Sequence, residues 1–161
     1  MFAKFKTLLF GDKRPIVHSV VHPIVGTLTY SADEDAWLTD PDASGCGFGF
    51  YVSAERNPNA ATIRPAAELI EHAAQIASNP EVFAKSVRVL VESQLTTVKS
   101  LHADRDEIER LRVYRVALMW PERPDDGEIE LRTGPDSDRM WHCAYLGRKP
   151  SPPLVFSGLD L

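Results

Sequence analysis

Residues 64–101 read RPAAELIEHAAQIASNPEVFAKSVRVLVESQLTTVKSL, and this stretch decides the fold. Between residues 66 and 77, apolar residues recur every three or four positions, which is the period of an amphipathic helix. Asn79 and Pro80 are suited to the cap and the first position of a second helix. The apolar stripe of this second helix continues to about residue 102. The sequence therefore predicts two consecutive helices in the middle of the chain.

Strand patterns lie on both sides of this helix pair. They predict strands over 16–22, 26–30, 36–39 and 45–53 before it, and over 112–120, 127–133, 139–146 and 154–159 after it. Asp104 and Glu107 resemble a capping box, which predicts a short helical turn before the second set of strands. Because the helices are segregated from antiparallel strands, we expect an α+β fold: an antiparallel β-meander, a helix pair and a second antiparallel β-meander.

The size and composition of the chain fit one globular domain. It has 161 residues, of which 43% are hydrophobic and 25% are charged, and chains of this length usually form one domain. We expect a short amphipathic helix over 1–11 and a single α+β domain over 12–161. Because the helix carries only two lysines, residues 1–10 predict at most a weak contact with a membrane surface.

The cysteines and the N-terminal residues predict a cytoplasmic location. Cys46 and Cys143 lie in no paired motif, which favours two reduced thiols over a disulfide. The N-terminal residues lack the long apolar core and the cleavage site of a secretory signal. No apolar run reaches the ~20 residues that span a membrane, so we expect no transmembrane segment.

Acidic residues outnumber basic ones and gather in two segments. Lys and Arg number 18 against 23 Asp and Glu, a net charge of −5, which disfavours a nucleic-acid partner. Residues 31–44 hold five acids and no base, and residues 121–138 hold seven acids and two bases. Solvated turns would explain these segments, and so would an acidic face for a basic protein. The candidate partner-binding residues are Asp33, Glu34, Asp35, Trp37, Asp40, Asp42, Asp125, Asp126 and Trp141.

The sequence offers no spacing typical of a catalytic, cofactor or metal site. The run GCGFG at 45–49 leads into a strand, whereas a phosphate loop leads into a helix, so we expect its three glycines to line one strand face. On a strand, His18 and His22 would lie about 13 Å apart, too far to share an ion. His142 and Cys143 are adjacent on a strand and point to opposite faces. We therefore expect no catalytic residue, no cofactor and no metal.

Several short patterns resemble one group of small bacterial domains of unknown function. Residues 22–30, HPIVGTLTY, match its opening strand pair, HPxxGxLxY, and Trp37 falls in its next strand. GEIEL at 127–131 and MWH at 140–142 are similar to its final strands. The resemblance covers about residues 20–160 and implies a cytoplasmic bacterial α+β domain without an assigned catalytic residue. Some small acidic bacterial domains of this type sit beside secreted toxins as immunity proteins.

These observations lead us to expect a non-enzymatic protein-binding domain. Its acidic face would bind a basic partner, such as the toxin that an immunity protein neutralises. The alternative is a small-molecule-binding or hydrolytic domain with a cleft between sheet and helices. A deep polar pocket that holds a strongly perturbed Glu, Asp or His would favour that alternative. The third hypothesis is an adaptor that contacts membrane surfaces through residues 1–10.

Overall fold

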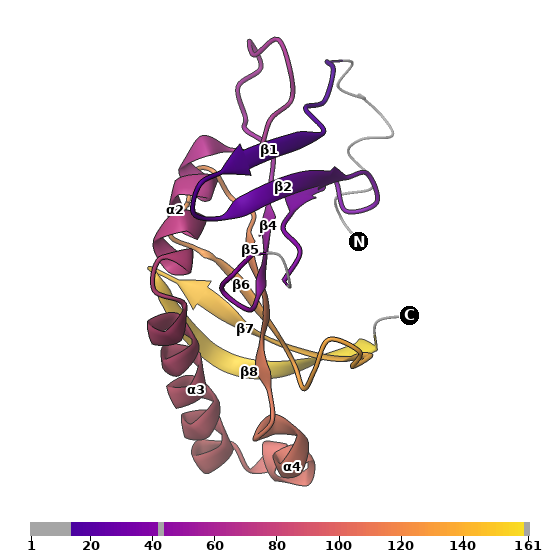
Figure 1. Ribbon diagram of the computed structural model, residues 1–161. Helices are drawn as coiled ribbons and strands as arrows, with labels where there is room; N and C mark the ends of the chain where they lie inside the picture. The colour runs from indigo at the N-terminus through magenta and orange to yellow at the C-terminus, as the bar shows by residue number, and fades with distance from the viewer. Residues whose placement is uncertain (1–13, 42–43, 160–161) are drawn as a thin grey trace.

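An eight-stranded sheet forms the frame of the protein, and helices cover one of its faces (Figure 1). The computed structural model describes residues 14–41 and 44–159. The strands are β1 (Ser19–His22), β2 (Gly26–Ser31), β3 (Ala36–Leu38), β4 (Gly49–Val52), β5 (Arg112–Leu118), β6 (Gly127–Arg132), β7 (Arg139–Leu146) and β8 (Lys149–Leu159). The helices are α2 (Ala67–Ala77), α3 (Pro80–Thr97), the 3₁₀ turn η1 (Lys99–Asp104) and α4 (Arg105–Ile108).

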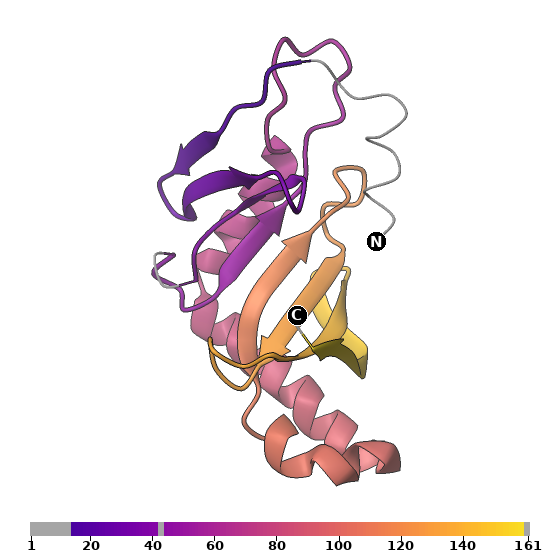
Figure 2. The same ribbon diagram turned by 90° about the vertical axis from the view of Figure 1, so that its right-hand side faces the viewer.

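The strands lie in the sheet in the order of the chain, and one junction between them is parallel. β1 to β4 pair antiparallel with their neighbours, and so do β5 to β8. β4 and β5 run parallel, with Gly49 opposite Arg115 and Val52 opposite Leu118. Between these two strands the chain crosses through α2 and α3, which Figure 2 shows behind the sheet. A parallel pair requires such a crossover.

The expected α+β class is confirmed, and the expected arrangement is matched in part. The two sets of strands join through β4 and β5 into one sheet, so they are not two separate meanders. η1 and α4 also follow the helix pair before β5 begins. Among the strands, β1 begins at Ser19 instead of residue 16, and β8 begins at Lys149 instead of residue 154.

The core lies between the helices and the face of the sheet that they cover. Alternate residues of the central strands point into it; these are Phe50, Val52, Val116 and Leu118, all fully buried. The helices contribute the buried residues Leu69, Ile70, Ala73, Ile76, Phe83, Val87, Val91 and Leu95. Burying a large apolar side chain contributes about 1.5–3 kcal/mol. The burial of these side chains therefore holds both helices against the sheet.

The glycine-rich run does not form the expected strand face. β4 begins at Gly49, and residues 44–48 are bends. Gly45 and Gly47 have φ angles of 71° and 81°, a backbone region that residues with a Cβ rarely adopt. The expected row of three glycines is wrong, because two of them turn the chain before the strand starts.

Some sequence expectations fall on residues that the structure does not describe. The helix over 1–11 and its membrane contact through residues 1–10 are among them, and so is Asp42. Within the described ranges, no helix is long and apolar enough to cross a membrane.

Glu107 fastens α4 to the sheet instead of capping its own helix. Its carboxylate accepts hydrogen bonds from Arg139 Nε at 2.8 Å and from Trp141 Nε1 at 2.9 Å, both in β7. Arg139 also lies over the ring of Phe156, 4.4 Å from its centroid. Burial alone would raise the pKa of Glu107, but the hydrogen bonds from Arg139 and Trp141 hold it below its usual value. The expected capping box is wrong, since β7 takes the carboxylate and Asp104 makes no side-chain cap bond.

Replacing Glu107 with alanine should destabilise the protein by about 1–3 kcal/mol, because it leaves the buried Trp141 N–H without its acceptor. Arg139 would keep its contact with Asp104 at 3.5 Å. Urea unfolding measures this loss. The contribution of Glu107 exists above its unfolded pKa and is lost as the pH falls through its lowered folded pKa. The difference between wild type and Glu107→Ala should therefore shrink in acid.

Glu109→Ala is the matched control for this substitution. It removes an exposed carboxylate that lies 3.2 Å from Arg105, and exposed pairs of this kind contribute less than about 0.5 kcal/mol. Equal losses in the two variants would refute the fastening role of Glu107.

Candidate functional site

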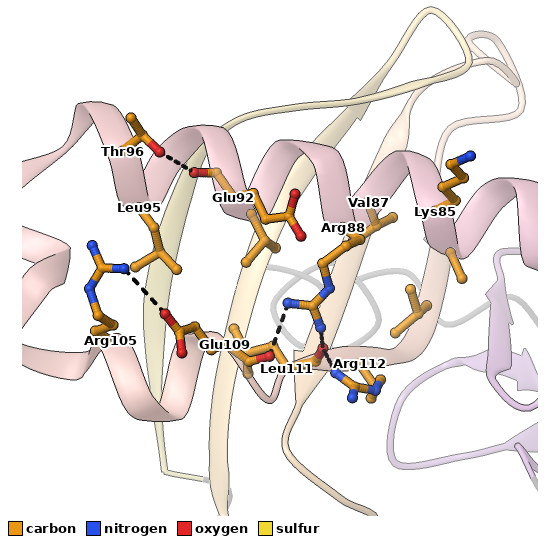
Figure 3. A pocket seen from close by; sticks show the side chains of 13 residues that line it. Lys85, Val87, Arg88, Glu92, Leu95, Thr96, Arg105, Glu109, Leu111 and Arg112 are labelled. Atoms are coloured by element: carbon orange, nitrogen blue, oxygen red, sulfur yellow. Dashed lines mark hydrogen bonds and ion pairs between the residues drawn. The ribbon is translucent and has the colours of Figure 1, made fainter.

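A groove of about 660 Å³ runs between α3 and the segment that leads from α4 into β5 (Figure 3). Its floor is apolar and consists of Val87, Val91, Leu95 and Leu111. Its rim carries Lys85, Arg88, Glu92, Thr96, Arg105, Glu109 and Arg112. The groove thus combines an apolar strip with charged edges.

The helical period of α3 places polar and apolar rows side by side. The polar residues Lys85, Arg88, Glu92 and Thr96 follow at steps of three and four positions, so they lie along one line of the helix. The helix rises by ~1.5 Å per residue, which gives this line a length of about 16 Å. Both rows therefore extend along several turns of α3.

Arg88 joins the walls of the groove through main-chain carbonyls, and Arg112 bonds a carbonyl within its own wall. Arg88 donates from Nη1 to the carbonyl of Glu109 at 3.0 Å and from Nη2 to that of Leu111 at 2.7 Å (Figure 3). Arg112 donates from Nη1 to the Leu111 carbonyl at 2.9 Å. Because a carbonyl carries no net charge, these bonds position both guanidinium groups without neutralising them.

The rim is positive although the chain as a whole is acidic. Four of its side chains are cationic and two are anionic, a balance of +2 in a chain of net charge −5. Glu109 is already paired with Arg105 at 3.2 Å. Lys85 forms no ion pair with any residue that the structure describes. The remaining charges of the rim are therefore those of Lys85, Arg88 and Arg112 against Glu92, which gives the balance of +2.

The first predicted acidic segment includes the turn between β2 and β3. Glu34 pairs with Arg115 of β5 at 2.9 Å, on the sheet face away from the helices. Asp35 accepts a hydrogen bond from the Tyr30 hydroxyl at 2.7 Å. Asp33 is exposed and makes no ion pair within the described ranges. Asp33 is thus the carboxylate of this turn that remains open to a partner.

The second predicted acidic segment includes the turn between β5 and β6. Asp125 pairs with Arg148 at 2.6 Å, and Asp126 lies 3.7 Å from Arg123. Asp125 also lies 3.6 Å from Nδ1 of His72, on the helix side of the sheet. The two acidic turns therefore meet different partners on different sides of the sheet, which gives no support to a single acidic face.

The other predicted binding residues are scattered. Trp37 is 0% exposed and Trp141 is 2% exposed, so both indoles belong to the core and offer a partner no contact surface. Asp40 is exposed and lies beside a separate hollow of about 390 Å³ that also contains Tyr114 and Arg132. The structure therefore does not bring the predicted residues together into one site.

A buried polar cluster lies where α2 meets β7. His72 Nε2 and the Tyr145 hydroxyl are 3.0 Å apart, and these residues are 3% and 2% exposed. Burial raises the pKa of Tyr145 to about 12, which keeps its hydroxyl neutral. The direction of the hydrogen bond depends on which ring nitrogen of His72 carries the proton. Burial and the nearby Arg148 lower the pKa of His72. Sequence reasoning missed this cluster because its two members are 73 positions apart and no local spacing links them.

This cluster has the order carboxylate, imidazole, hydroxyl, but its geometry does not fit nucleophilic catalysis. The 3.6 Å between Asp125 and His72 is too long for a hydrogen bond, and a tyrosine with a pKa of about 12 is not activated. Burial also raises the pKa of the Cys143 thiol to about 12, which makes it unreactive. As expected, the adjacent His142 lies on the other face of the sheet.

The described part of the chain contains no group of three or more His, Cys, Asp or Glu side chains that could hold a metal ion. His22, one of the two histidines considered above, has a structural role. Its Nδ1 accepts a hydrogen bond from the Ile24 N–H at 3.2 Å, and its Nε2 lies 3.7 Å from Glu71. Cys46 and Cys143 are both free thiols.

Comparisons with protein-family models, with curated proteins and with solved structures found no significant match. The bacterial family that HPIVGTLTY at 22–30 resembles therefore stays a prediction, and so does the immunity role.

The free energy of unfolding should fall between pH 7 and pH 5 because of His72. Its pKa is lowered in the folded protein, so the unfolded chain binds the proton more readily, and stability is lost as the pH falls through about 6.5. One such group contributes a slope of at most about 1.4 kcal/mol per pH unit. Urea unfolding at a series of pH values measures this slope.

His72→Gln should flatten the slope, since glutamine does not titrate. His18→Gln changes an exposed histidine and should leave the slope as it is in the wild type. If the free energy of unfolding of His72→Gln depends on pH as steeply as that of the wild type, His72 is not the cause of the pH dependence.

Proposed function

We propose that the protein is a non-enzymatic binding domain that holds an acidic, partly apolar segment of a partner protein in the groove beside α3. The observation that carries this proposal is an apolar floor with a positive rim in a chain of net charge −5. Complementary charge across an interface speeds association and fixes the register of the partner. The groove can therefore attract a negatively charged segment.

The dimensions of the groove suit a short extended segment. A strand advances ~3.3 Å per residue, so about five residues match the roughly 16 Å length of the polar row on α3. Val91 and Leu95 in the floor are only 2% and 4% exposed, which leaves a narrow apolar contact. Charge therefore provides most of the recognition, and binding should be sensitive to salt.

The surface of α3 beside the groove favours a protein as the partner. Val82 and Val89 are 69% and 59% exposed, and with Lys85 they follow at helical spacing. Figure 1 shows α3 at the outside of the molecule, where a partner can approach it. Exposed apolar side chains next to a charged rim are typical of protein–protein contact surfaces.

One form of this proposal is an immunity protein that holds a segment of a toxin in the groove. The competing form is the one expected from the sequence, in which the acidic turns bind a basic partner such as a toxin. Exposed Asp33 favours it. However, Glu34 and Asp125 are already paired with arginines, which weakens the attraction those turns can exert.

The small-molecule or hydrolytic alternative has less support. The hollow next to His72 and Tyr145 holds about 310 Å³, which is at the lower limit of ordinary ligand pockets, ~300–1,000 Å³. The perturbed groups in it favour neutral forms, since the pKa of Tyr145 is raised to about 12 and that of His72 is lowered. A neutral, hydrogen-bonded pair of this kind stabilises the fold.

A capped, fluorescent peptide of sequence Glu-Leu-Glu-Leu-Glu-Leu should bind the full chain more tightly than its Lys-Leu counterpart, and added salt should weaken the binding. Lys85→Glu should reduce the affinity about three- to tenfold, because it reverses a rim charge that has no internal partner. Fluorescence anisotropy measures both effects.

Lys149→Glu makes the same charge change on β8 and should leave the affinity within about twofold of the wild type. Asp33→Lys separates the two forms of the proposal, since it changes an acidic turn and leaves the groove intact. If the wild type prefers the Lys-Leu peptide and Asp33→Lys loses this preference, the binding site is the acidic turn and not the groove. Equal affinity for both peptides would reject the groove outright.

A further inference from the structure

The two edges of the sheet differ in whether another strand can pair with them. β8 forms one edge and carries Pro150, Pro152 and Pro153. Proline has no N–H and cannot donate to a neighbouring strand, so these residues close the first part of that edge to pairing. In the remainder, the Leu154 N–H donates to Oε1 of Gln94 in α3 at 3.3 Å. β1 forms the other edge with the sequence SVVH and contains no proline.

Directly before β1, Ile63 occupies the outer side of the chain, since the Val17 N–H donates to the Ile63 carbonyl at 2.9 Å and the Ile63 N–H donates to the Pro15 carbonyl at 2.8 Å. Beyond this bridge, no strand of the described ranges lies beside the outer backbone groups of β1. On the inner side, the His18 carbonyl accepts a hydrogen bond from the Tyr30 N–H at 2.8 Å. Because hydrogen bonding alternates along an antiparallel pair, the N–H and C=O groups of Ser19 and Val21 point away from β2. They offer two donors and two acceptors to an incoming strand.

The side chains at this edge include no Asp, Glu, Lys or Arg, and its two valines are apolar. Val21 is 74% exposed, and Ile24 in the turn after β1 is 48% exposed. Residues 15–32 contain no Asp, Glu, Lys or Arg, although 25% of the chain is charged. Edge strands are usually protected by charged residues or prolines, and β1 has neither. This edge is therefore suited to pairing with another strand.

We propose that β1 pairs antiparallel with β1 of a second copy of this chain, which continues the sheet across a dimer. In the two-fold arrangement centred on Val20, Ser19 of each copy lies opposite Val21 of the other, and their outward groups form four hydrogen bonds. An uncharged strand meets its own copy without local repulsion, although each chain carries −5.

A two-fold contact of β1 with itself is closed by its symmetry. The prolines of β8 disfavour pairing of β1 in one copy with the first part of β8 in the next, and such a head-to-tail contact is the kind that grows into filaments. Pairing of β1 with itself uses the same edge twice and stops at two copies. The interface involves four residues of β1 from each copy, so it belongs to the small and reversible class below ~1,200 Å².

Sedimentation velocity of the full chain over a roughly hundredfold range of concentration tests the dimer. The wild type should pass from monomer to dimer and no further. Val21→Pro removes one outward donor from each copy, so two of the four hydrogen bonds are lost, and the dissociation constant should rise at least about tenfold. The dimer does not depend on the groove, so Val21→Pro should bind the Glu-Leu peptide as tightly as the wild type does.

Two further variants keep the test independent of folding defects. Val21→Lys adds a charge at an exposed position, so the fold should be retained by circular dichroism while dimerisation weakens. Val155→Lys makes the same change on β8, at a valine that is 39% exposed, and should dimerise like the wild type.

Amide hydrogen exchange adds a second readout. The amides of Ser19 and Val21 should become protected as the protein concentration rises. Complete protection in the monomer would show that another part of this chain covers β1, and it would overturn the proposal. The proposal would also be overturned if the wild type stays monomeric at every concentration or grows beyond a dimer. The same holds if both Val21 variants dimerise as tightly as the wild type.

Discussion

The parallel pairing of β4 with β5 is the contact on which the rest of the structure depends. Two parallel neighbours cannot be joined by a hairpin, so the chain must return along the sheet before it enters β5. Here α2 and α3 make that return on one side. Their apolar stripes then bury the covered face, and one continuous core follows. The opposite face carries charge instead, as the contact of Arg115 with Glu34 shows.

The same crossing produces the candidate groove. α3 ends at Thr97, and η1 and α4 turn the chain back toward β5. Arg88 closes this junction by donating to the carbonyls of Glu109 and Leu111. The groove is thus the seam between the crossover and the returning strand. Part of its positive charge follows from the arginines that hold the seam together.

The sequence predicted the helices and strands better than the contacts between them. The recurrence of apolar residues every three to four positions correctly predicted that α2 ends at Ala77, because the contacts that form a helix are local. The parallel junction had no local signal, since it pairs residues from distant parts of the chain. The carboxylate of Glu34 seemed available because its partner Arg115 lies 81 positions away. Lys85 was visible in the sequence only as a polar position of a helix, and such positions are usually solvated.

The single parallel junction also sets the order in which the protein assembles. Within each half, every strand pairs with its neighbour in the chain, so those contacts have low sequence separation. The junction from Gly49 to Arg115 closes a much longer loop, which costs more conformational entropy and slows folding. We therefore expect each four-stranded half to form first, and the pairing of β4 with β5 across four residue pairs to be the slow step of folding.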